Sequence, residues 1–328
     1  MSDSEPLVLR SPANPTVRRL IRLRDNRTRR RQKRLLVDGW RETLQAIDAG
    51  LDLVGLFLPE SSLTEHGNFE HGNFEHGNFD RAPADREAQF RPNHSPRPVH
   101  DAPPSSLPAS SDAAGSDPRV RIVIEKTKTS QTIRFVSDAV MARIAYGESS
   151  RGVVSEFVQP DHSLEDLSLP ANALVLVLDS LEKPGNIGAV FRCADAAGVD
   201  AVILCGGGSD IYNPNAIRSS LGTVFQIPTA VGSETEVARF LCDQKIRPLA
   251  ARVESSDELW ATDFSGSIAV IVGSEANGLG ERWQHDANNV VIHGVRIPMF
   301  GKVDSLNVSV SAALVLFEAR RQRPQQKA

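Results

Sequence analysis

The second half of the chain alternates short apolar runs with segments of helical character. From Ala171 onward, apolar runs recur at LVLVLD (174–179), AVILCG (201–206), FQIPTA (225–230), RPLAARV (247–253), IAVIVG (268–273) and VVIHGVRIP (290–298). Strands that alternate with helices predict a parallel sheet covered by helices, and we expect a last helix from about Asn307 to Arg321. Ligands of such sheets bind beyond the carboxyl ends of the strands, so the loops after these runs are candidate sites.

The first 160 residues contain a second, smaller pattern of strands and helices. The expected elements are a helix and a basic turn, strands at Leu35–Val37, 51–58 and 152–158, and a helix that ends near Gly50. Within 119–145 we expect a strand at the start and then a segment that leads into a short helix. A chain of 328 residues is long enough for two domains. We place a small α/β domain at 1–160 and the larger α/β domain at 171–328.

Residues 64–118 differ in character from the segments on either side. The unit EHGNF repeats in tandem, and a stretch rich in Pro, Ser, Asp and Ala follows it. This composition predicts a disordered insertion in the first domain. His66, His71 and His76 raise a metal hypothesis, but a spacing of five does not align imidazoles on one face of a helix or strand. We therefore expect no bound metal.

Positive charge is concentrated near the N-terminus, although the whole chain has a net charge of −4. Between Arg10 and Arg34 the sequence is dominated by arginine, and Asp25 is the acidic residue among them. Such a block is either a basic arm for phosphate or a solvated helix face. Arginine suits phosphate because its planar guanidinium matches two oxygens, so we predict nucleic-acid contacts here. The predicted RNA-binding residues are Arg27, Arg29, Arg30 and Arg31.

Compartment and membrane association can also be read from the composition. The sequence has no apolar run of about 18 residues, so no membrane span is expected. The N-terminal segment lacks the apolar core of a secretory signal. Cys193, Cys205 and Cys242 are odd in number and lack CxxC spacing, which favours a reducing cytoplasm over a disulfide framework or a zinc site.

The loop after the first apolar run of the second half reads EKPGNIGAVFRCAD (182–195). Its glycines are spaced GxxG, so it lacks the GxGxxG fingerprint of dinucleotide-binding proteins. Asn186 is either a helix cap or a ligand contact. Arg192 is either a surface residue or a charge that faces a cleft, and the apolar residues around it favour the cleft.

Two later loops carry similar groups of small polar residues. GSEANGLG (273–280) follows an apolar strand, and Glu275 is its candidate polar contact, although its glycines also suit a tight turn. In MFGKVDSLN (299–307), Ser305 and Asn307 precede an apolar helix and are also suited to capping it. Three such strand-to-helix turns together predict one composite pocket at one edge of the sheet.

These three blocks, in this order, resemble the motifs of the SpoU (TrmH-like) family of RNA ribose 2′-O-methyltransferases, within the SPOUT class. The resemblance covers about 174–322, and SDIYNPNAIRSSLGTVFQIP (209–228) between the first two blocks also fits it. More loosely, residues 14–47 resemble the accessory substrate-binding domain of that family. Asp38-Gly39 and AYGESSRGVVSEF (145–157) depart from the family pattern, and 64–118 is not a family feature, which affects the choice of RNA more than catalysis.

The resemblance implies a SPOUT-type parallel sheet with a C-terminal trefoil knot, and a homodimer whose active site lies near the subunit interface. It implies transfer of a methyl group from S-adenosylmethionine to a ribose 2′-OH of rRNA or tRNA. The catalytic positions that match are Arg192, Asn186, Glu275, Ser305 and Asn307. The matching cofactor contacts are Gly273, Ile297 and Leu306, with Met299 close by. Arg192 matches the arginine that activates the hydroxyl, as a base or as an electrostatic stabiliser.

Two other functions compete with this hypothesis. A SPOUT enzyme that methylates a base nitrogen would keep the cofactor site but would not need Arg192 beside Asn186. An RNA-binding protein with a dead active site would tolerate the loss of Arg192, Glu275 or Asn307, and all three are present. Methylation at a pyrimidine C5 would need a nucleophilic cysteine, and we interpret Cys193 as a small buried residue.

Overall fold

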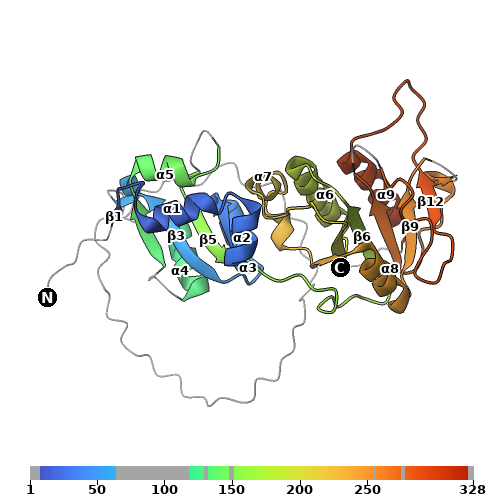
Figure 1. Cartoon of the computed structure of the whole chain (residues 1–328), viewed down its shortest axis with the longest axis horizontal. Coiled ribbons are helices and arrows are strands. Elements are labelled where there is room, and N and C mark those ends of the chain that lie inside the picture. The colour runs from blue at the N-terminus through green and yellow to red at the C-terminus, as the bar shows by residue number, and fades with distance from the viewer. Residues whose placement is uncertain are drawn as a thin grey trace, which may run out of the picture.

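The computed structural model contains two α/β units, each built on its own sheet (Figure 1). It describes residues 8–63, 118–128, 132–147, 151–253, 256–274 and 278–323. The predicted insertion at 64–118, with the three histidines of the repeat, lies outside these ranges, except for Pro118, which begins a helix. Glu275 also lies outside the described ranges.

The C-terminal unit is built on a seven-stranded sheet in the order β10-β12-β9-β11-β6-β7-β8. Its strands are β6 (Leu174–Asp179), β7 (Ala201–Cys205), β8 (Thr229–Gly232), β9 (Arg247–Ala251), β10 (Ser256–Glu258), β11 (Ile268–Val272) and β12 (His293–Arg296). All neighbouring strands run parallel, as the alternating pattern predicts. Our expected strands match six of these; β10 was not anticipated, and β8 begins only at Thr229 because Thr223–Phe225 form the 3-10 helix η2.

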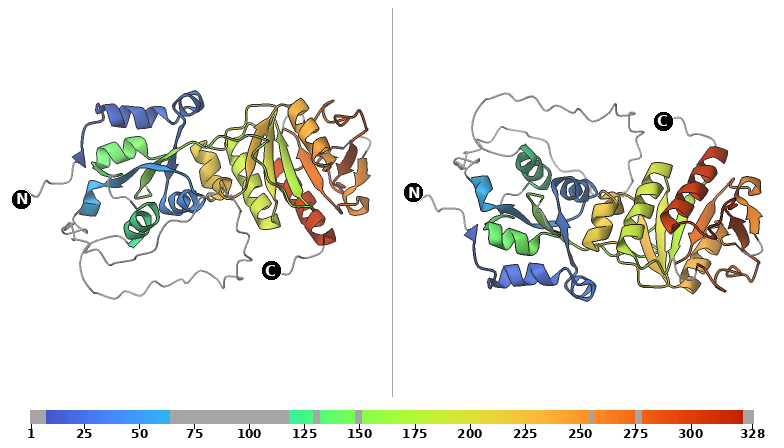
Figure 2. Two further views of the ribbon diagram at one scale, coloured as in Figure 1. Left: turned by 90° about the horizontal axis from the view of Figure 1, so that it is seen from below. Right: turned by 90° about the horizontal axis from the view of Figure 1, so that it is seen from above.

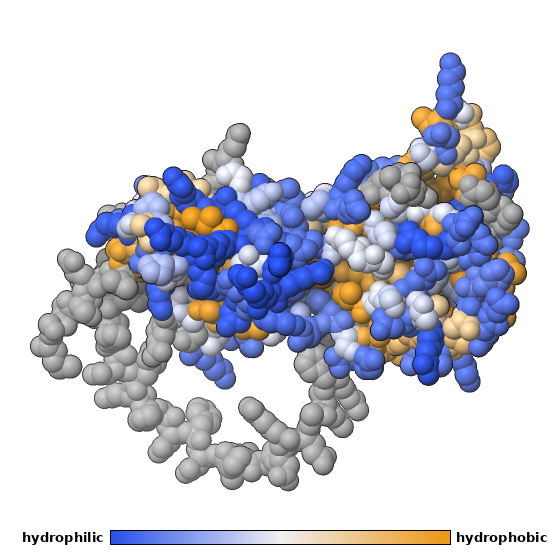
Figure 3. Space-filling model, viewed as in Figure 1, coloured by the Kyte–Doolittle hydropathy of each residue, from blue (hydrophilic) through white to orange (hydrophobic). Residues whose placement is uncertain are grey.

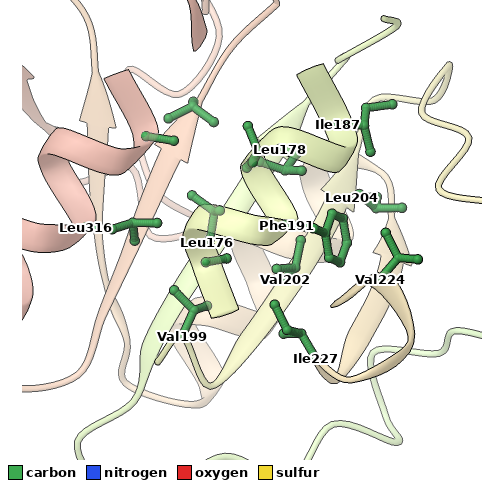
Figure 4. Packing of buried hydrophobic residues seen from close by; sticks show 14 of the residues in the cluster. Leu176, Leu178, Ile187, Phe191, Val199, Val202, Leu204, Val224, Ile227 and Leu316 are labelled. Atoms are coloured by element: carbon green, nitrogen blue, oxygen red, sulfur yellow. The ribbon is translucent and has the colours of Figure 1, made fainter. Parts of the chain in front are cut away.

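Helices cover both faces of this sheet (Figure 2). The helices are α6 (Pro184–Ala197), α7 (Pro214–Ser219), α8 (Glu234–Asp243) and α9 (Val308–Gln322), with the 3-10 helix η3 at Leu259–Ala261. Successive side chains of β6 point to opposite faces, so Leu176 packs with α6 and α9 while Val177 packs with α8. Phe191 of α6 lies among Leu178, Val202 and Val224 in this core (Figure 4).

The N-terminal unit has a five-stranded sheet in the order β1-β4-β3-β5-β2. Its strands are β1 (Val8–Leu9), β2 (Arg34–Asp38), β3 (Leu53–Pro59), β4 (Ile133–Val136) and β5 (Val154–Val158), and its helices are α1 (Pro15–Arg22), α2 (Asn26–Gln32), α3 (Trp40–Asp48), α4 (Pro118–Thr127) and α5 (Asp138–Ile144), with η1 at Glu60–Leu63. Helices α1 and α5 cover one face, and α3 and α4 cover the other. β5 runs antiparallel to both of its neighbours.

Two predictions for the N-terminal unit are wrong. The segment 119–124 is part of helix α4, because Val120 and Val123 are buried three residues apart while Ile122 is exposed. Packing on one helical face outweighs the β-propensity of this Val- and Ile-rich run. The expected basic turn is helix α2, whose first turn is capped by Asp25 through the backbone N–H of Thr28 at 2.8 Å.

The two units share one continuous hydrophobic core. Leu35 of β2 and Phe157 of β5 belong to the same buried cluster as Ile217 and Val224 of the C-terminal unit. A hydrogen bond from Gln226 Nε2 to the backbone oxygen of Gln45, 2.8 Å long, also crosses the boundary. The N-terminal unit is therefore packed onto the C-terminal unit through β2, α3 and α7.

Candidate active site

The loops that carry the three polar motifs lie at one edge of the C-terminal sheet. They follow β6, β11 and β12, three strands that run parallel, so their carboxyl ends share an edge. β6 and β11 are direct neighbours, and β9 separates β11 from β12. The predicted convergence of the three loops at one sheet edge agrees with this topology.

Helix α6 presents the first motif. It begins at Pro184, with Lys183 as its N-cap, so Asn186 is not the capping residue. A β-carbon added at Gly188 would lie 1.9 Å from Ser219 Oγ of α7, so the close approach of these helices requires glycine there. Arg192 is exposed on α6, on the same side of the helix as the exposed Asp195 and Ala196.

A hydrogen bond joins the first motif to the third. Asn307 Nδ2 donates to Asn186 Oδ1 over 3.2 Å. Asn307 is also the N-cap of α9, because its Oδ1 accepts from the backbone N–H of Ser309 at 2.9 Å. The capping role of Asn307 is confirmed, and its membership of the site stays a prediction.

The remaining predicted catalytic residues are Ser305, Arg192 and Glu275. Ser305 is exposed, and its hydroxyl reaches Asp304 at 3.5 Å, the outer limit of a hydrogen bond. No ion pair joins Arg192 to a carboxylate of the residues that the structure describes. Glu275 lies in the short gap between Ser274 and Gly278, outside the described residues.

The residues predicted to hold the cofactor lie in two loops at this edge. Gly273 is buried at the end of β11, where an added β-carbon would lie 2.2 Å from the carbonyl carbon and oxygen of Gly278. The chain therefore passes close to itself here and admits no side chain. Ile297, Met299 and Leu306 are half-buried in the loop between β12 and α9, and Ile297 packs against the main core.

A buried carboxylate ties the first loop to the second. Asp179, the last residue of β6, is fully buried and accepts hydrogen bonds from Trp283 Nε1 at 2.7 Å and Arg282 Nη1 at 2.8 Å. The Ser180 hydroxyl donates to the same carboxylate at 2.9 Å. Sequence reasoning missed this cluster. The available signal was an aspartate at the end of an otherwise apolar strand, beside a predicted site.

The thiol of Cys193 does not provide a reactive nucleophile in this site. Burial raises the pKa of Cys193, which disfavours the thiolate that would attack a substrate. Cys193 is half-buried on α6, so it is less buried than our interpretation of it as a small buried residue. Within the described part of the chain, no group of three or more His, Cys, Asp or Glu side chains could hold a metal ion.

The basic block of the N-terminal unit divides into exposed and structural arginines. Arg27, Arg30 and Arg31 are exposed on α2, and strongly hydrophilic residues cover this region of the surface (Figure 3). Arg29, predicted to bind RNA, is instead 1 % exposed and paired with Asp210 of the C-terminal unit. The pattern of the charges could not show this, because the partner lies 181 positions away in the sequence. Arg19 is likewise engaged, by the buried Glu156.

Within the described residues, no helix is long and apolar enough to cross a membrane.

Known proteins similar to this chain agree in the chemistry they perform. A model of the SpoU rRNA Methylase family matches residues 173–317. The 23S rRNA (guanosine-2′-O-)-methyltransferase RlmB of Xylella fastidiosa is 38 % identical over 200 residues, which are 58 % of this chain and 78 % of that protein. The 23S rRNA (uridine(2479)-2′-O)-methyltransferase of Streptomyces viridochromogenes is 29 % identical over 204 residues, covering 60 % of this chain and 70 % of that protein.

Solved structures match almost the whole chain. The crystal structure of an RNA 2′-O ribose methyltransferase is 31 % identical, with a TM-score of 0.68 over 96 % of this chain and 99 % of that one. An AdoMet-bound rRNA methyltransferase from Sinorhizobium meliloti has a TM-score of 0.72 at 22 % identity, over 97 % and 98 % of the two chains. The likeness therefore includes the N-terminal unit as well as the segment with the three motifs.

Proposed function

This chain belongs to the SpoU rRNA methylase family and is an S-adenosylmethionine-dependent RNA 2′-O-methyltransferase, and we propose that its substrate is 23S ribosomal RNA. For the reaction, the observation that carries this function is that the three motif loops lie at one edge of the sheet, where Asn307 donates a hydrogen bond to Asn186. Support for 23S rRNA comes from relatives named for that RNA, which span both guanosine and uridine targets.

The predicted cofactor residues fit the chemistry of S-adenosylmethionine. Gly273 lets the backbone of Gly278 pass close to the end of β11 and so shapes this loop, and Ile297, Met299 and Leu306 offer half-buried apolar surface for an adenine ring. The bound cofactor supplies a methyl group on a sulfonium centre, which a ribose oxygen attacks directly. The chain therefore needs no nucleophile of its own, in agreement with the raised pKa of Cys193.

We assign the activation of the ribose hydroxyl to Arg192. A guanidinium normally carries a positive charge, and such a charge stabilises the oxygen anion that develops as the 2′-OH loses its proton. Asn186 and Asn307 are already oriented by their mutual hydrogen bond, so they are suited to hold the nucleotide in line with the methyl group. Glu275 and Ser305 complete the proposed set of polar contacts.

The N-terminal unit, residues 1–160, is the proposed RNA-binding domain, and 171–328 is the proposed methyltransferase domain. Phosphates would be bound by the exposed Arg27, Arg30 and Arg31 of α2. The proposal includes a trefoil knot in the C-terminal part of the chain. Its support is the family membership and the return of the chain from β12, paired with β9 and β10, into α9 against α6. We also propose that the enzyme works in the cytoplasm, where ribosomal RNA is modified.

A homodimer is the proposed assembly. Val310, Leu314 and Phe317 of α9 are exposed on one side of the helix, and Trp260 lines the same shallow pocket as Leu314 and Phe317. The opposite side of α9 is buried against α6. A surface with this much exposed aromatic and aliphatic area suits a second copy of the chain, because dimer interfaces with two-fold symmetry are self-complementary.

The test is methyl transfer from labelled S-adenosylmethionine to unmodified transcripts of 23S rRNA, 16S rRNA and tRNA, followed by alkaline digestion. A 2′-O-methyl group removes the hydroxyl that drives strand cleavage in alkali, so we expect label in alkali-resistant dinucleotides from 23S rRNA. Label in mononucleotides would mean a base target. Label confined to tRNA or 16S rRNA would retain the reaction and reject the proposed substrate.

A further inference from the structure

Arg29 lies in the basic helix α2, yet its guanidinium faces the interior. The side chain is 1 % exposed. Its Nη1 donates to the backbone oxygens of Leu23 and Arg24, each at 2.7 Å, just beyond the end of α1. Its Nη2 forms an ion pair with Asp210. One guanidinium therefore binds the end of α1 and a loop of the C-terminal unit at the same time.

Asp210, the partner of Arg29, is also mostly shielded from solvent. Asp210 is 15 % exposed and stands in the loop between β7 and α7. Burial raises the pKa of Asp210, and the nearby charge of Arg29 opposes this shift. A buried pair of this kind is strongly destabilised when one partner is removed, because the other charge is left without compensation.

The ion pair lies beside the core that joins the two units. Leu35, in the strand that follows α2, packs in one cluster with Ile217 and Val224. The hydrogen bond from Gln226 to Gln45 fixes α3 to the same region. Helix α2 is therefore held between its own unit and the C-terminal unit, and its exposed arginines have a set place on the protein.

We propose that Arg29 is a positioning residue, whose ion pair with Asp210 fixes α2 on the C-terminal unit and so sets where α2 holds RNA relative to Arg192. This inference rests on the proposed function, and it deepens it. The substrate RNA is held by a rigid pair of units rather than by a basic arm that moves independently. The charge of Arg29 is used within the protein, in the ion pair with Asp210, and its exposed neighbours on α2 make the phosphate contacts.

The first test replaces Asp210 in the full-length chain. Asp210→Asn keeps the size of the side chain and removes the charge that holds Arg29. We expect kcat/KM for 23S rRNA to fall by about 10- to 100-fold, because small misplacements of a substrate have large effects on rate. The salt dependence of RNA binding should not change, because no phosphate contact is lost. Unchanged kcat/KM would overturn the proposal. Tighter binding with a steeper salt slope would overturn it too, because it would show that Arg29 is a phosphate ligand.

A double variant separates positioning from phosphate binding and guards against simple misfolding. Arg29→Met with Asp210→Leu replaces the ion pair by an apolar pair, a change that buried sites often accept without loss of stability. We expect this variant to recover most of the activity that Asp210→Asn loses, with the wild-type salt slope. A double variant that is as impaired as Arg29→Met alone, with a slope reduced by about 0.7 to 0.9, would assign Arg29 to phosphate. Arg31→Gln is the reference for one lost contact.

A third measurement does not depend on the reaction. Amide hydrogen exchange of α2 in the RNA-free protein should be faster in Asp210→Asn than in the wild type, because the helix loses its attachment. Equal exchange rates would refute the fixed placement of α2, whatever the substrate. Wild-type protein that fails to methylate any RNA would refute the proposed function instead, and faster exchange in the variant would still support the attachment.

Discussion

At the scale of single residues, Asn307 shows how one side chain serves structure and site together. Its side-chain oxygen Oδ1 accepts from the backbone N–H and the hydroxyl of Ser309, at 2.9 and 2.7 Å. Its amide nitrogen remains to donate to Asn186. Because the cap fixes the amide, the direction of the donor is set by the start of α9. Aspartate would keep the cap and lose the donor.

Arg192 gives the sharpest prediction at this scale. Arg192→Ala should reduce kcat to the limit of detection, because the charge that stabilises the ribose oxygen anion is lost. Binding of S-adenosylmethionine, measured by calorimetry, should stay within about threefold of the wild type, since Arg192 is exposed on α6 and is not among the proposed cofactor contacts. A variant that keeps near wild-type turnover would refute the assigned role. Arg239→Ala, an exposed arginine on α8, is the matched control.

The second residue-scale prediction concerns Asp179. Its carboxylate accepts from two side chains of the loop after β11, Arg282 and Trp283, so it fixes that loop to the end of β6. Asp179→Asn should lower the stability of the protein by about 1 to 3 kcal/mol, because the buried carboxylate loses its charge-assisted hydrogen bonds to Trp283 and to Arg282, whose side chain is itself 36 % exposed. Urea unfolding followed by circular dichroism measures the change. A loss below about 1 kcal/mol would mean that the cluster contributes little.

At the scale of elements, α2 is a helix with two kinds of arginine. Replacing Arg27, Arg30 and Arg31 together by Gln should flatten the plot of log Kd for RNA against log salt by about two units, at roughly 0.7 for each lost contact with single-stranded RNA. Filter binding at several salt concentrations measures the slope. Arg239→Gln on α8 should leave it unchanged. An unaltered slope in the triple variant would remove α2 from the RNA-binding surface.

How well the sequence predicts the structure differs from one helix or strand to another. The central strands of the C-terminal sheet were predictable because they are buried on both faces, as at β6, where every residue is buried, whereas the exposed edge strand β10 was not. Helix α4 was not, because its Val- and Ile-rich segment is compatible with either period until a packing surface selects one. The three motif loops were placed at one edge from strand direction alone. The partners of Arg29 and Asp179 lie more than a hundred positions away, and local pattern cannot identify them.

At the scale of the whole molecule, the outer face of α9 tests the proposed assembly. Phe317 is 51 % exposed in the single chain. Phe317→Asp would place a charge in the proposed interface, so light scattering should show a dimer for the wild type and a monomer for the variant. Val231→Asp, at an exposed apolar position on the edge strand β8, should leave the dimer intact. A dimeric Phe317 variant would mean that another surface mediates association.

His162 lies in the segment between β5 and β6, which joins the two units, and its contacts with the C-terminal unit should be sensitive to pH. Its Nδ1–H donates to the Thr229 oxygen at 2.9 Å, because a carbonyl only accepts, and in the neutral ring Nε2 accepts from the Tyr212 hydroxyl at 2.7 Å. Burial lowers the pKa of His162. A folded-state pKa below the unfolded value, about 6.5, means that this stabilisation is present above pH 6.5 and is lost as the pH falls through the folded pKa.

Urea unfolding at pH 7.5 and 5.0 measures this contribution as a difference between proteins. The loss of stability on acidification should be smaller in His162→Gln, which cannot be protonated, than in the wild type. Groups that titrate elsewhere affect both proteins equally and cancel in the comparison. Equal losses in the two proteins would show that His162 does not respond in this range.

The core shared by the two units has a consequence for how such chains can change over generations. Leu35 and Phe157 cover apolar residues of the C-terminal unit, among them Ile217 and Val224. If recombination replaced the N-terminal unit by an unrelated domain, these residues would be exposed to water unless the new domain matched their shape. New RNA targets should therefore arise through point changes on the exposed face of α2, while the two halves are inherited together.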